Sequence, residues 1–95
     1  MQSYKVAHLN IQNQHIIFVP LDRQFGYRTN EEQTAFVASL QRCADSAGLQ
    51  GRIVPAWEAS GERTIFMGPQ PWHPFFNGIN LAWVWTNINR ELTCG

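Results

Sequence analysis

Residues 68–92 read GPQPWHPFFNGINLAWVWTNINREL and join a proline-rich segment to a long apolar run. This stretch holds five of the chain's twelve aromatic residues and three of its five prolines. Proline restricts the backbone, so residues 68–74 are predicted to form a stiff loop. Residues 75–92 that follow are predicted to form a helix.

The predicted helix has two apolar faces, whereas a helix packed on one surface needs only one. At 100° per residue, one stripe faces the core, and the second lies on nearly the opposite side. The core stripe comprises Leu81, Val84, Trp85, Ile88 and Leu92, and the second comprises Phe76, Ile79 and Trp83.

Three interpretations of the second stripe compete. In the first, the loop 68–74 or the other helix folds over Trp83 within one chain. In the second, Phe76, Ile79 and Trp83 form a subunit interface, where tryptophan and phenylalanine are enriched. In the third, the stripe is one wall of a ligand pocket. A rival interface is the uncovered sheet face, which would carry Phe18 and, in addition, Val54 and Phe66.

The first part of the chain predicts two hairpins separated by a helix. Strands are expected at 4–12 and 15–21 around an Asn13-Gln14 turn, and at 52–59 and 63–67 around a turn at 60–62. The run HIIFVPL is apolar on both faces, which favours an interior strand, whereas Pro55 favours an edge strand or a bulge. Between the hairpins, Thr29 and Glu32 have capping-box spacing, and Gly48 suits a helix end.

The element order is therefore ββαββα in one domain, residues 1–95. We expect an α+β two-layer sandwich: a four-stranded, mainly antiparallel sheet with both helices on one face.

Composition limits the classes of function. Charged residues make up 15% of the chain, and seven acidic residues balance seven basic ones. This balance argues against a nucleic-acid partner, because a nucleic-acid-binding protein normally carries a stripe of basic residues. A weakly charged surface is poorly protected against association, so a homodimer is expected. Neither a signal peptide nor a membrane span is evident, which makes the cytoplasm the default location.

The metal-ligating and redox-active residue types show no diagnostic spacing. Two distant cysteines indicate neither a disulfide framework nor a zinc site. Cys43 is expected to act as a small buried apolar residue. Cys94, next to the terminus, could cross-link two chains in air, which would be an artefact in a reducing cytoplasm. His8 and His15 flank the first turn without coinciding cross-strand partners, and we interpret them as exposed strand residues rather than metal ligands. No metal and no cofactor are predicted.

One ligand pocket is suggested by the two loops that precede the helices. If both loops lie at one end of the sheet, they gather arginine, aromatic and histidine side chains able to hold a planar or anionic ligand. The candidate residues are Arg23, Tyr27, Arg28, Trp72 and His73. His73 with Asp22 could form an acid–base pair, but no third member is evident, and no catalytic residue is predicted.

The sequence thus predicts a small binding protein without a specific activity. The leading hypothesis is a homodimer that binds a protein partner or a small ligand. The alternative is a small-molecule-binding domain or weak enzyme with a pocket at the two loops. An enzyme is the less favoured reading.

Overall fold

The computed structural model describes residues 2–59, 63–68 and 70–94. The predicted turn at 60–62 lies outside the described residues. The elements follow one another as β1 (Gln2–Ile11), β2 (Gln14–Pro20), η1 (Arg23–Tyr27), α1 (Asn30–Ser46), β3 (Arg52–Ala59), β4 (Arg63–Phe66), η3 (Gln70–Trp72), α2 (His73–Phe76), α3 (Leu81–Thr86) and β5 (Arg90–Cys94). The class is α+β, as predicted.

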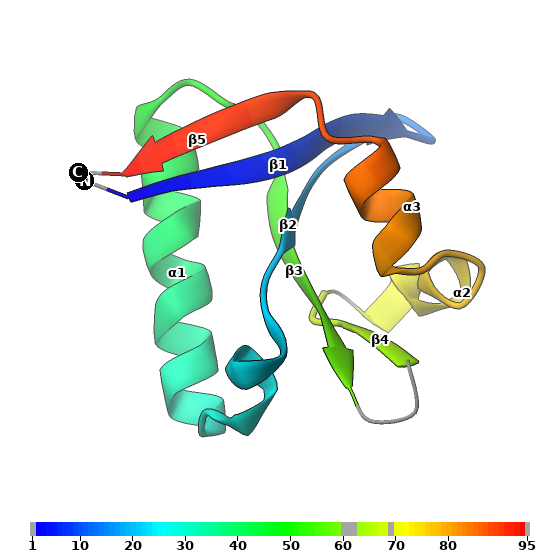
Figure 1. The fold of residues 1–95 in the computed structure, drawn as a ribbon. Coiled ribbons are helices and arrows are strands. Elements are labelled where there is room, and N and C mark those ends of the chain that lie inside the picture. Colours follow the sequence, from blue (N-terminus) through cyan, green and yellow to red (C-terminus); the bar gives the residue numbers. More distant parts are fainter. Residues whose placement is uncertain (1, 60–62, 69, 95) are drawn as a thin grey trace.

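The five described strands form one mixed sheet in the order β4-β3-β2-β1-β5 (Figure 1). Three pairs are antiparallel, but β2 and β3 run parallel, with Phe18 opposite Val54. Parallel neighbours need a crossover connection, which α1 supplies. The prediction of four mainly antiparallel strands was therefore incomplete: it lacked β5 and the parallel pair.

The β1–β2 hairpin turns through Gln12 and Asn13, one residue earlier than predicted. Their φ angles are 51° and 65°. Two consecutive positive φ values define a type I′ turn, whose twist matches that of the flanking strands. The resulting register places Ala7 opposite Phe18 and Ile11 opposite Gln14.

The interior position of β2 follows from its sequence. Ile17 and Val19 belong to the cluster under α1, while Ile16 and Phe18 belong to the cluster on the other face. Because side chains alternate along a strand, a run that is apolar at every position is buried on both sides. The prediction of an interior strand is confirmed.

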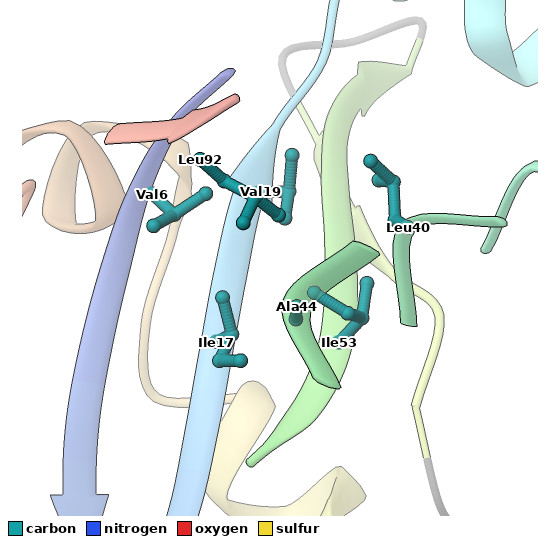
Figure 2. Close-up of a cluster of buried hydrophobic side chains, with 7 residues drawn as sticks. All are labelled: Val6, Ile17, Val19, Leu40, Ala44, Ile53 and Leu92. Carbon is teal, nitrogen blue, oxygen red and sulfur yellow. The ribbon is translucent and has the colours of Figure 1, made fainter. Parts of the chain in front are cut away.

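Helices cover both faces of the sheet, so the fold has three layers rather than the predicted two (Figure 1). Figure 2 shows the cluster on the α1 face, formed by Val6, Ile17, Val19, Leu40, Ala44, Ile53 and Leu92. On the opposite face, Phe76 of α2 and Val84 of α3 pack against Phe18, Val54 and Ala56. The sheet face that was expected to be uncovered is thus covered within the chain.

The start of α1 was predicted correctly because its signals are local. Thr29 is the N-cap, and its hydroxyl accepts from the Glu32 backbone N–H at 3.1 Å. The Thr29 backbone N–H donates in return to Glu32 Oε1 at 3.0 Å. The pKa of Glu32 is lowered, chiefly by this hydrogen bond from the Thr29 backbone and secondly by hydrogen bonding with the Thr29 side chain. At the other end Gly48 takes a φ of 75°, as predicted.

The single helix predicted at 75–92 is instead two short helices and a strand. The chain turns at Asn77 and Gly78, and Asn80 caps α3 by accepting from the Trp83 backbone N–H at 2.9 Å. Asparagine competes for backbone hydrogen bonds and so starts or ends helices more readily than it extends them. The final residues then leave the helical path and pair with β1 as β5.

Pro55 does not mark an edge strand, which was one of the two alternatives predicted for it, the other being a bulge. Strand β3 lies between β2 and β4, and Pro55 is buried opposite Val19. Its carbonyl oxygen still accepts from the Met67 backbone N–H at 3.1 Å.

The two cysteines form a disulfide, which corrects the expectation of separate thiols. Cys43 of α1 and Cys94 of β5 have Cα atoms 5.7 Å apart across a sequence separation of 51 residues. The spacing rules missed the pair because only the folded chain brings α1 and β5 together. Disulfides persist mainly in oxidising compartments. The cytoplasmic location therefore stays a prediction with this observation against it.

Candidate functional site

A hollow of about 380 Å³ lies between the end of the β1–β2 hairpin and the proline-rich segment. This volume falls within the range of roughly 300–1,000 Å³ that is typical of small-molecule pockets. Its lining combines two isoleucines, two aromatic rings and two prolines with two glutamines: Ile11, Ile16, Trp72, Phe75, Pro71, Pro74, Gln12 and Gln14.

The hairpin supplies one side of the hollow. Ile11 ends β1, Gln14 begins β2, and Ile16 is buried. The type I′ turn fixes the register of the two strands, so these side chains have defined positions relative to one another.

The proline-rich segment supplies the other side through η3 and α2. Pro74 stands in the first turn of α2, where proline is tolerated because its missing N–H would have no helical partner. Phe75 packs against Trp83 with ring centroids 6.0 Å apart, and Trp83 packs against Phe18 at 5.6 Å. This aromatic chain anchors the segment to the buried core of the sheet.

The hollow has a simple chemical character. All of the described lining residues are uncharged, and six of these eight are apolar. Gln12 and Gln14 each carry an amide that can donate and accept hydrogen bonds. The arrangement can take an apolar body and orient one polar group, but the lining residues that the structure describes include no nucleophile, acid or base.

The predicted ligand residues of the first loop lie elsewhere. Arg23 forms an ion pair with Glu58 at 2.7 Å, and Tyr27 is 80% exposed. The Arg28 guanidinium carbon lies 5.9 Å from the ring centroids of both Phe25 and Phe36.

The two loops do not form one pocket. Trp72 lines the hollow at the hairpin, Arg28 lines a smaller one beside η1, and His73 lines a third beside β4. The suggested acid–base pair is likewise not assembled around one site. Asp22 accepts from the Gln24 backbone N–H at 2.8 Å, and His73 Nε2 lies 3.3 Å from the Gly68 carbonyl oxygen.

The three predicted interface residues pack toward the core of their own chain. Phe76 is 5% exposed, and Ile79 and Trp83 are partly buried against the same cluster. This is the arrangement of the first interpretation, in which the chain covers Trp83 itself. The exposed aromatic residue of α3 is Trp85, at 52%, which had been assigned to the core stripe.

Of the lining residues, sequence reasoning selected only Trp72. Ile11 and Ile16 belong to strands and carry no local sign of a pocket. Their contribution depends on the segment around Trp72, some 60 residues away, folding back beside the hairpin turn. A local pattern holds no information on that approach.

No protein-family model matches the chain, and comparisons with curated proteins and with solved structures give no significant match. Among the described residues, no helix has the length and apolarity that crossing a bilayer requires.

Proposed function

We propose that the protein is a binding domain whose hollow at the hairpin takes a small, uncharged ligand with an aromatic or aliphatic body. The observation that supports this most is the lining itself: two aromatic rings, two isoleucines and two prolines around about 380 Å³.

The ligand class follows from the energetics of burial. Apolar surface removed from water contributes about 25 cal/mol per Å². A charged group would lose hydration, and the described lining offers no opposite charge in return. A neutral hydrogen-bonding group, by contrast, can pair with the Gln12 or Gln14 amide. The anionic ligand considered for the arginine loops is therefore not favoured at this hollow.

Indole and benzoate are suitable probes, because they have similar size and differ in charge. We expect an amide NMR titration to show saturable indole binding at the hairpin end and around Trp72, with benzoate at least about tenfold weaker. Trp72→Ala should weaken indole binding by about tenfold, because it removes a large part of the apolar contact.

Arg28→Ala is the matched control, since Arg28 lines a different hollow. Indole binding should be unchanged in this variant. Loss of binding in Arg28→Ala with retention in Trp72→Ala would instead support a site at η1 and refute the proposal.

A homodimer is the second candidate, and exposed Trp85 supports it. Tryptophan is enriched among the residues that contribute most to binding, which cluster near the centre of an interface. Trp85 is 52% exposed, whereas Trp83 packs against Phe18.

Light scattering behind a sizing column tests this candidate. The unmodified protein should show a dimer mass, and Trp85→Glu should convert it to a folded monomer. Trp83→Glu should unfold the chain instead, because it places a charge against the buried core. A monomer mass for the unmodified protein at high concentration would remove the dimer proposal.

A further inference from the structure

Two histidines lie side by side on the β1–β2 hairpin, on the face opposite the hollow. In the register, His8 pairs with Ile17 and His15 with Asn10, so the histidines are diagonal neighbours. Side chains two residues apart on a strand lie on the same face of the sheet. His8 therefore shares a face with Val6, and His15 shares a face with Ile17; both Val6 and Ile17 belong to the cluster under α1. Their ring centroids are 5.6 Å apart.

A backbone carbonyl selects the tautomer of His8. Nε2 of His8 lies 2.7 Å from the Gln50 carbonyl oxygen. A carbonyl only accepts, so Nε2 carries the proton and donates it. In the neutral ring Nδ1 then holds a lone pair. Metal-binding histidines are commonly oriented in this way, with the second ring nitrogen donating to a carbonyl.

We propose that His8 and His15 together bind one divalent transition-metal ion, with Cu²⁺ the tightest. Metal–nitrogen bonds of about 2.0–2.1 Å would place two imidazole centroids about 5 Å apart in a tetrahedral site, and about 4.5 Å apart on neighbouring positions of the tetragonal site that Cu²⁺ prefers. The observed separation is 5.6 Å, so side-chain rotation that brings the two rings closer together allows either geometry.

The metal class follows from the ligands. The described residues contain no group of three or more His, Cys, Asp or Glu side chains that could hold a metal, so the site is a pair completed by water. Imidazole suits Cu²⁺, Ni²⁺ and Zn²⁺, and affinity rises toward Cu²⁺ in this series. Mg²⁺ and Ca²⁺ require oxygen ligands that the pair lacks.

Titration of the protein with Cu²⁺ in buffer without reductant, monitored by electron paramagnetic resonance, tests the proposal. Both cysteines are held in the disulfide, so no thiolate competes for the metal. The unmodified protein should bind one Cu²⁺ with two coordinated imidazole nitrogens. His8→Ala and His15→Ala should each leave one nitrogen and weaken binding by about tenfold or more, because the chelate is lost.

His73→Ala is the matched control, because His73 lies beside Gly68 and Phe76 instead. It should bind Cu²⁺ as the unmodified protein does. Circular dichroism verifies that each variant is folded, and His15→Asn replaces His15→Ala if the latter is not. Equal binding by the His15 and His73 variants, or fewer than two imidazole nitrogens in the unmodified protein, would overturn the proposal.

Discussion

At the scale of single residues, the close approach of Gly26 to Trp57 illustrates how tightly η1 is held. A Cβ atom at Gly26 would lie 2.6 Å from Trp57 Nε1 and 3.0 Å from Trp57 Cδ1. Trp57 cannot easily move away, because it is buried and its ring lies 4.9 Å from that of Phe25. Only glycine fits beside this indole.

Gly26→Ala is therefore expected to destabilise the fold by about 1–3 kcal/mol, the usual cost of overpacking. Urea denaturation measures the loss. Gly78→Ala is the control, because its Cβ would meet only an ordinary contact at 3.6 Å. If both variants lose the same small amount, Gly26 is not confined by Trp57.

Amide side chains show what composition could and could not indicate. The chain has fifteen Asn and Gln residues, a residue class that is mostly exposed in folded proteins. Several instead bond to the backbone, two of them at strands β1 and β3. Asn89 accepts from the His8 N–H and donates to the His8 carbonyl, both at 2.8 Å. Gln41 bonds in the same way to Gly51 and Ile53, both at 2.9 Å. Such roles depend on tertiary contacts and leave no local pattern.

At the scale of elements, the contrast between α1 and residues 75–92 separates local from distant causes. The capping box marks the start of α1 and Gly48 marks its end, and both signals are local in the sequence. Residues 90–94 are a strand because they pair with β1, where Leu92 lies opposite Tyr4. Helical periodicity placed Leu92 on the same stripe as Val84, yet the two side chains are buried on opposite faces of the sheet.

The disulfide joins two elements that have no sequence relation, α1 and β5. Closing a loop of this length restricts the unfolded chain and contributes about 4 kcal/mol in the entropic model, with measured values of typically 2–4 kcal/mol. Reduction should lower the free energy of unfolding by about 2–4 kcal/mol, as measured by urea denaturation with and without reductant.

The double variant Cys43→Ser/Cys94→Ser provides the control. It should match the reduced protein in stability and should not respond to reductant. Titratable thiols in the folded, unreduced protein would show that the disulfide is absent.

At the scale of the whole molecule, the sequence predicted the α+β class but not the number of layers. The continuous apolar run of β2 indicated burial on both faces, which already requires covering elements on both sides. Reading residues 75–92 as one helix obscured this requirement. The pocket prediction placed Trp72 and Arg28 together because their loops precede helices in both halves of the chain. With helices on opposite faces, the two residues line separate hollows.

The proposal that the hairpin hollow takes an uncharged apolar ligand is tested most directly by fluorine NMR of the protein labelled with fluorotryptophan. The chain has four tryptophans, and Trp72→Phe identifies the resonance of Trp72. Indole should shift the Trp72 resonance to saturation and leave exposed Trp85 unchanged, while benzoate should shift neither. An unchanged Trp72 resonance at saturating indole, or an equal response to benzoate, would contradict the proposal.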